Sequence, residues 1–298
     1  MAARKTSKAQ RRIETYVAHS SVKAGASAAA IQSAYKIEVK FLGGLNAKQK
    51  KAFKTAANRW TKVIIGDVPS VIVNGVVIDD LLIEAQGVAI DGVGKILGQA
   101  GPTQLRPASA GANAFLPAKG IMSFDTADLA QMEADGTLVD VITHEMGHVI
   151  GIGTIWDRKG LLAGARTANP TFTGKNAKKE FGTLKGTAPA AVPVENSGGA
   201  GTRDSHWRES LFMNELMSGF IESPNNPISR LTVASLKDLG YVVNMNAAEP
   251  YSLPNLQHLA ERGLMAFRAG REQVHAHALP IFAPKVLPDN SLNIPPNR

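Results

Sequence analysis

Two histidines and a glutamate within five residues are the part of this sequence best suited to chemistry. Residues 144–154 read HEMGHVIGIGT, so His144 and His148 are one turn apart on any α-helix that contains them and share its face. Both imidazoles can then bind one zinc ion. Glu145 lies beside them, where a carboxylate can take the proton of a metal-activated water. This spacing is typical of zinc metalloproteases.

The residues around the motif favour the helix that it requires. Residues 138–150 place apolar side chains at helical spacing, and an expected strand, GIMSFD at residues 120–125, precedes them. Gly151 follows His148 by three positions, where a glycine lets the chain turn away so that a later residue can return to the metal. The sequence therefore predicts a buried helix that carries the motif.

A catalytic zinc site has three protein ligands and one open position, so a third ligand must come from elsewhere in the chain. The extended metzincin motif has a histidine ten residues after the first, but Thr154 stands at that position. Either the site lacks its third ligand or the ligand follows an insertion. His206 is the best placed of the remaining histidines, because it follows a Gly-rich stretch and precedes Met217 in the turn-like sequence LMSG. The alternatives are an ordinary loop histidine and an ordinary core methionine.

The composition limits what can bind a metal. The 298 residues include no Cys, which excludes disulfides, thiolate ligands, a cysteine nucleophile and a thiol that keeps a metal site latent. Any metal must therefore be bound by His, Asp or Glu. No stretch is long and apolar enough for a membrane span. The N-terminus lacks the apolar segment of an ordinary signal peptide, so we expect none.

The net charge of +8 is unevenly distributed. Residues 1–62 carry 14 Lys or Arg against 2 Asp or Glu, whereas residues 63–157 carry 3 against 12. A basic arm could attract nucleic acid or an acidic surface by releasing counterions. A solvated tail and a Lys-rich helix face explain the charge equally simply. We favour them because no nucleic-acid motif accompanies it.

Composition and periodicity also divide the chain. We expect a flexible, partly helical basic arm (residues 1–34), a catalytic domain (35–250), and a C-terminal helix with a Pro-rich tail (251–298). The domain divides into an upper half of about residues 35–150 and a lower half of about residues 151–250, which contains a loop-rich insertion at 152–205. The expected elements are a strand from Ile37, a helix at 47–65, strands or hairpins at 71–100, and helices at 228–239 and 255–268.

With these residues in view, the sequence resembles the leishmanolysin family of zinc metallopeptidases, and in particular its cysteine-free bacterial and phage-type relatives. The similarity covers about residues 37–243. The segments that carry it are THEMGHVIGIGTIW (143–156), HWRESLFMNELMSGF (206–220) and ISRLTVASLKDLGY (228–241). In that family a long insertion separates the motif glycine from the third histidine.

The resemblance implies an α+β, metzincin-like fold with the active site between an upper sheet-and-helix half and an irregular lower half. By matching positions, it implies one zinc ion with His144, His148 and His206 as ligands. Glu145 would be the general base and Met217 the Met-turn methionine beneath the metal. It also implies an extended substrate paired with an edge strand of the upper sheet. We predict GIMSFD for that strand, with Ile121, Ser123 and Phe124 as contact residues.

The sequence thus predicts a zinc-dependent endopeptidase that hydrolyses peptide bonds in proteins through a metal-activated water, with Glu145 as general base. The alternative is a particle-associated or nucleic-acid-contacting binding protein whose zinc site is not proteolytic. Glu145 argues against it, because a structural zinc site is closed by four ligands and needs no base. The family resemblance suggests action outside the cell or from a particle.

Two other groups of possible ligands carry less weight. His275 and His277 could form a second metal site, although an exposed coincidence explains them as well. Asp79, Asp80 and Asp91 lie near glycines and could bind calcium, but turn chemistry explains them equally. We predict no site at either group.

Overall fold

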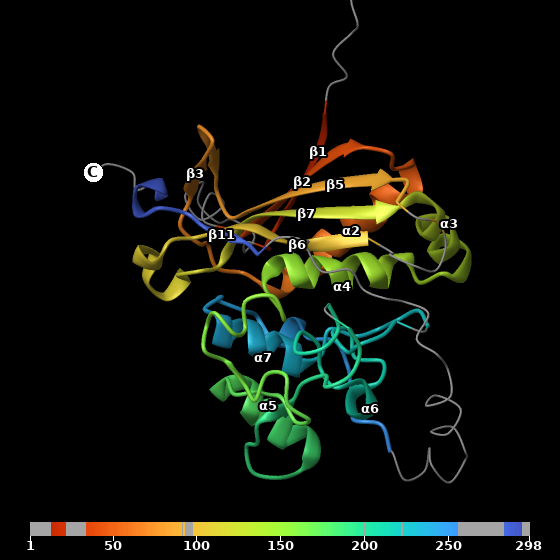
Figure 1. Ribbon diagram of the computed structural model, residues 1–298, viewed down its shortest axis with the longest axis vertical. Helices are drawn as coiled ribbons and strands as arrows, with labels where there is room; N and C mark the ends of the chain where they lie inside the picture. The colour runs from red at the N-terminus through yellow and green to blue at the C-terminus, as the bar shows by residue number, and fades with distance from the viewer. Residues whose placement is uncertain are drawn as a thin grey trace, which may run out of the picture.

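The computed structural model describes residues 13–21, 34–90, 92, 98–199, 201–221, 223–255 and 283–293. The fold is a mixed α+β arrangement, as predicted. A twisted sheet with two long helices beneath it forms the upper half in Figure 1, and shorter helices and loops form the lower half. Among the helices of the described residues, none is both long enough and apolar enough to cross a membrane.

The main sheet has six strands in the order β1-β2-β5-β7-β6-β11. Their bounds are β1 Glu14–His19, β2 Lys36–Gly43, β5 Leu81–Val88, β7 Pro117–Asp125, β6 Gly98–Leu105 and β11 Lys285–Val286. Strands β2, β5 and β7 are parallel, β1 and β6 run antiparallel to their neighbours β2 and β7, and β11 is parallel to β6. The predicted alternation in β2 is confirmed, because Ile37, Val39 and Phe41 are buried between partly exposed residues.

The prediction that GIMSFD is an edge strand is wrong. Its residues lie in β7, which pairs with β5 on one side and with β6 on the other, so Ile121, Ser123 and Phe124 are inside the sheet. Most of β7 is buried, as expected of a central strand. The outer strand beside it is β6, whose Pro102 is a residue that sheets accept chiefly at edges and bulges.

Helices α2 (Ala47–Val63) and α4 (Leu138–Ile150) pack against each other and against the sheet (Figure 1). Helix α2 begins with a capping box between Asn46 and Gln49. Its apolar face includes Trp60, whose indole Nε1 donates to the carbonyl of Thr143 on α4 at 2.9 Å. Helix α3 (Thr126–Asp135) leads from β7 to α4. The helix that carries the predicted metal-binding motif is therefore enclosed by the sheet, by α2 and by the lower half.

The lower half contains more regular structure than its composition suggested. Its helices are α5 Lys175–Lys185, α6 Glu209–Phe212 and α7 Arg230–Leu239, and its small sheet consists of β8 Leu162–Ala163, β9 Thr171–Phe172 and β10 Val192–Pro193. Helix α5 and this sheet lie in the stretch predicted to be a loop-rich insertion. Few apolar residues suffice there, because a cluster of aromatic rings forms the local core: Trp156, Phe172, Trp207 and Phe212.

The N-terminal arm differs from expectation where it is described. Residues 14–19, assigned to a partly helical arm, form strand β1, because Ala18 packs inward and the backbone pairs with β2.

Strands β3 (Val71–Val73) and β4 (Val76–Ile78) form a hairpin that turns at Asn74-Gly75, as the Asn-Gly signal predicts. The helix predicted at 255–268 and the pair His275 and His277 lie outside the described residues.

Candidate metal centre

The structure brings the three predicted histidines together. His144 and His148 project from α4, and His206 arrives from the loop that precedes α6. The Nε2 atoms of the three rings lie 3.0 Å from one another in every pairing. All three side chains are buried. The three rings thus converge on one point between the upper and lower halves.

The contact that Nδ1 of each histidine makes indicates where the ring carries its proton. Each Nδ1 contacts a backbone carbonyl: Leu216 for His144 (2.6 Å), Ile152 for His148 (2.9 Å) and Thr202 for His206 (2.9 Å). Because a carbonyl oxygen only accepts hydrogen bonds, each Nδ1 carries a proton, and in the neutral ring Nε2 then presents a lone pair. Three lone pairs that face one another at this distance repel each other unless a cation lies among them.

The donor set fits a zinc ion. Two nitrogens bound about 2.0–2.1 Å from a tetrahedral ion lie roughly 3.3 Å apart, close to the separation found here. Neutral imidazoles with the second nitrogen bonded to a carbonyl are the usual form of zinc-binding histidines. In the described part of the chain, this cluster of possible ligand atoms contains the three histidines and no fourth residue. The arrangement therefore suits an ion that keeps a position open for water or substrate.

Glu145 and Met217 lie next to this cluster in different ways. Glu145 follows His144 on α4 and is 4% exposed. Met217 is buried, and its sulfur packs against the backbone of α4 at Gly147, where a built Cβ would be 2.8 Å from Sδ. The predicted Met-turn residue thus contacts the motif helix between its two histidines.

The loop that delivers His206 is held close to the end of α4. Gly153 has a φ of +76°, and a Cβ built on it would lie 2.1 Å from the carbonyl oxygen of Ser205. Thr154, at the position where the extended motif has its histidine, instead donates its hydroxyl to the carbonyl of His148 at 2.8 Å. Only glycine permits this approach, so Gly153 helps to place the third histidine.

Glu215 is a buried residue that the sequence interpretation missed. Its Oε1 accepts hydrogen bonds from Ser229 and Thr232, and its Oε2 accepts from the backbone N–H of Met217 at 2.6 Å. Burial raises the pKa of Glu215, and these donors oppose the rise. Its place in the apolar stretch LFMNELM was the available signal, because a lone carboxylate there must either be exposed or have partners.

The acidic residues considered for calcium are already engaged. Asp79 pairs with the ammonium group of Lys36, and Asp80 accepts from the backbone N–H groups of Lys36 and Val68. Burial raises the pKa of Asp80 to about 7, and Asp67 and Asp79 add to the rise. Carboxylate oxygens of Asp67, Asp79 and Asp80 lie within 4.8 Å of one another, but the ion pair and the backbone donors account for these contacts, and we propose no calcium site here. Asp91 lies outside the described residues.

Comparison with known proteins finds matches in the part of the chain that contains this cluster. The model of the leishmanolysin family matches residues 108–255, a segment that contains the three histidines, Glu145 and Met217. A leishmanolysin homolog of Crithidia fasciculata is 29% identical over 137 residues, which cover 42% of this chain and 20% of the relative. A leishmanolysin-like peptidase of Caenorhabditis elegans is 39% identical over 77 residues, which cover 25% of this chain and 11% of the relative.

A mixed α+β fold with three converging histidines defines a candidate metalloprotein, and these matches show which family it resembles. The chain is leishmanolysin-like, as its sequence motifs indicated, and a metallopeptidase is the class that this family indicates. The matched regions span at most a fifth of the length of the two relatives.

Proposed function

We propose that this protein is a zinc-dependent endopeptidase of metzincin type. His144, His148 and His206 are the zinc ligands and Glu145 is the general base. The observation that carries the proposal is the convergence of three buried Nε2 atoms, 3.0 Å apart, beside a buried glutamate. Among the described residues the cluster has three histidines and no fourth His, Asp or Glu ligand, which supports a catalytic centre over a purely structural one.

A zinc ion bound by neutral ligands supplies Lewis acidity, which lowers the pKa of a coordinated water and polarises a carbonyl group. The residues of the chain do the rest. The Nδ1–H bonds to backbone carbonyls fix the orientation of the three rings. Glu145 takes the proton of the attacking water and passes it to the departing amine.

The substrate would pair with β6 rather than with β7. On the side of β6 away from β7, the described residues place only β11, which meets Gln104 and Leu105. Within the described part of the chain, residues 98–103 therefore have no strand partner on this side. Strand β6 also packs against α4, which carries the motif. An extended peptide added to this edge gains main-chain hydrogen bonds close to the metal centre, which favours peptides over other acyl substrates.

The alternative of a non-proteolytic binding protein has no observation that favours it. Most of the basic arm lies outside the described residues, and neither the fold of the described part nor the family match supports a contact with nucleic acid. Proteins or peptides are therefore the proposed substrates.

Metal content and proteolysis together test the proposal. We expect purified protein to bind about one zinc ion and to cleave denatured casein in a chelator-sensitive manner. His206→Ala should lose both properties, because a site with two imidazoles binds zinc far more weakly. The exposed residue His19 offers a matched control, and His19→Ala should retain both. Zinc binding without cleavage of any protein, or an unaffected His206→Ala variant, would overturn the proposal.

A further inference from the structure

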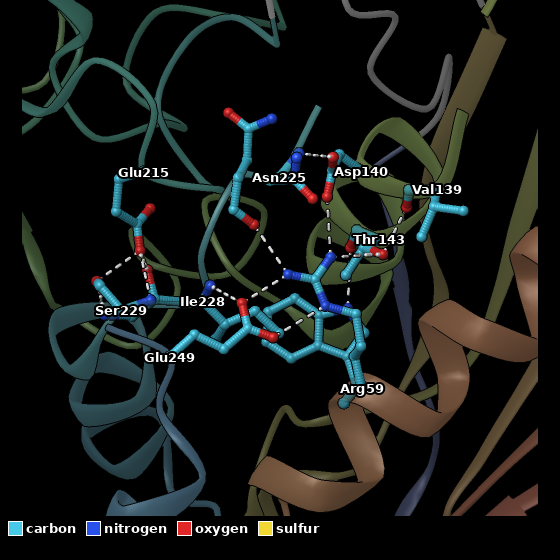
Figure 2. Close-up of polar contacts among 12 residues, drawn as sticks. Arg59, Val139, Asp140, Thr143, Glu215, Asn225, Ile228, Ser229 and Glu249 are labelled. Carbon is cyan, nitrogen blue, oxygen red and sulfur yellow. Dashed lines mark hydrogen bonds and ion pairs between the residues drawn. The ribbon is translucent and has the colours of Figure 1, made fainter. Parts of the chain in front are cut away.

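Arg59 on α2 joins the upper half to the lower half through a fully used guanidinium group (Figure 2). Its side chain is 16% exposed and lies between α4 and the segments around residues 226 and 249. It donates to both carboxylate oxygens of Glu249 (3.1 and 2.7 Å), to Asp140 (3.0 Å), to Thr143 Oγ1 (3.4 Å) and to the carbonyl of Asn226 (2.8 Å). A planar guanidinium can satisfy several acceptors in fixed directions, whereas a lysine cannot.

The contacts continue from Glu249 to the turn that carries Met217. Glu249 Oε2 accepts from the N–H of Ile228 at 2.8 Å. The next residue, Ser229, donates its N–H (3.1 Å) and its hydroxyl (2.6 Å) to Glu215 Oε1. Glu215 Oε2 in turn accepts from the N–H of Met217. Glu215 therefore fixes the backbone on both sides of Leu216.

This path returns to the metal centre at its first histidine. The carbonyl of Leu216 is the acceptor for His144 Nδ1 at 2.6 Å, and Thr143, which Arg59 contacts, precedes His144 on α4. Hydrogen bonds and chain segments thus form a closed ring that begins and ends at His144.

Glu215 also reaches the loop of the third histidine. Thr232 donates its hydroxyl to Glu215 at 2.5 Å and accepts from the indole Nε1 of Trp207 at 2.9 Å. Trp207 follows His206 and donates its backbone N–H to the carbonyl of Met217 at 2.9 Å. The carboxylate of Glu215 therefore helps to hold two parts of the backbone. One is Leu216, whose carbonyl accepts from His144, and the other is Trp207, which follows His206.

We propose that Glu215 and Arg59 are positioning residues for the metal centre, which hold the Leu216 carbonyl against His144 and so orient that ring for zinc. This inference rests on the proposed function, because it takes His144 to be a zinc ligand. Partners behind a ligating histidine commonly change metal affinity about 10- to 100-fold when they are lost. Neither residue belongs to the three-histidine motif.

The test measures metal binding, so that proteolysis is not needed as the readout. In Glu215→Gln the side-chain amide can no longer accept from both Ser229 and Met217, because one of its two polar atoms is a donor. We expect zinc affinity, measured by competition with a chromophoric chelator, to fall about 10- to 100-fold. The absorption bands of the cobalt-substituted variant should also shift. Arg59→Lys keeps the positive charge but loses the planar guanidinium group that donates to several acceptors at once. It should lower zinc affinity and shift the cobalt absorption bands in the same direction as Glu215→Gln.

The lower half offers a matched control pair. Arg230 on α7 forms a two-point contact with Glu180 on α5, at 3.0 and 3.3 Å, and its side chain is 51% exposed. Arg230→Lys removes a comparable two-point guanidinium contact, and the Arg230 side chain makes no hydrogen bond with the residues that link Arg59 to His144 in the path described above. We expect its zinc affinity and cobalt spectrum to match those of the unmodified protein.

Thermal unfolding with and without zinc separates positioning from general stability. A positioning role predicts that zinc raises the Tm of Glu215→Gln and Arg59→Lys less than it raises that of the unmodified protein. Equal loss of Tm in the metal-free and zinc-loaded forms, with unchanged zinc affinity and cobalt spectrum, would overturn the inference and leave the proposed function standing. An unmodified protein that binds no zinc would overturn the proposed function instead, and this inference with it.

Discussion

Met217 lies against Gly147, the residue directly before His148 on α4. A Cβ on Gly147 would lie 2.8 Å from the Met217 sulfur and 3.0 Å from Cζ2 of Trp60. Trp60 cannot move freely, because its indole donates to the carbonyl of Thr143. The helix and the turn beneath it can therefore approach this closely only because residue 147 has no side chain.

Gly147→Ala should therefore lower the free energy of unfolding by about 1–3 kcal/mol, because a methyl group overpacks this contact. Alanine favours helices over glycine, so helix propensity alone predicts the opposite sign. Denaturant unfolding of the metal-free protein measures the change. A suitable control is Gly199→Ala, where a built Cβ meets nothing within 4 Å. Equal stabilities of the two variants would show that Met217 and Trp60 yield without cost.

Glu145→Gln should separate metal binding from catalysis. The amide is nearly isosteric but cannot take a proton, and loss of a general base typically costs about 10²- to 10⁴-fold in rate. We expect kcat for casein or a peptide to fall in that range while zinc content stays at that of the unmodified protein. Retained cleavage would remove Glu145 from the base role, and loss of zinc would assign it a structural one.

Gly153→Ala tests how the third histidine is delivered. Its methyl group would meet the Ser205 carbonyl, one residue before His206, so we expect weaker zinc binding as well as lower stability. Gly75 in the β3-β4 hairpin has nearly the same φ, +78° against +76°, but a Cβ there meets nothing within 4 Å. Gly75→Ala therefore carries a similar backbone strain, of about 1–2 kcal/mol, without the clash. Zinc affinities that do not differ between these variants would argue against a role of the contact in placing His206.

Local patterns in the sequence predicted the residues of the three-histidine cluster. They did not predict the hydrogen bonds that support the cluster. The motif helix and the pairing of His206 with a methionine turn follow from spacing and family resemblance. Arg59 and Glu249 are 190 positions apart, and their contact exists only after both halves have folded. The assignment of the edge strand failed because GIMSFD reads as a strand without showing its neighbours, although Pro102 in β6 was a signal for the edge.

Pairing of the substrate with β6 can be tested through the substrate backbone. Replacing one amide of a peptide substrate by an ester removes an N–H donor and changes little else. At a position that pairs with β6, we expect kcat/KM to fall about 2- to 10-fold, as one net hydrogen bond is worth roughly 0.5–1.5 kcal/mol. A scan of esters along the peptide should show the loss at alternate positions, because successive amides of a strand point to opposite sides. A flat profile would contradict the pairing.

The pH dependence of stability should report on Asp80. Its pKa is about 7 in the folded protein, because burial disfavours the carboxylate, against an ordinary value of 3.8 in the unfolded chain. Between these two values the folded state holds a proton that the unfolded state has lost, so the contribution of Asp80 to stability declines as pH rises from about 4 to 7 and then levels off.

An Asp80→Asn variant, whose side chain cannot titrate, tests this dependence. It loses one acceptor for the N–H groups of Lys36 and Val68, and should be less stable than the unmodified protein at pH 4. That deficit should shrink towards pH 7, whereas the exposed variant Asp289→Asn should show no such trend. A deficit that stays constant or grows with pH would mean that Asp80 is already ionised in the folded protein at pH 4.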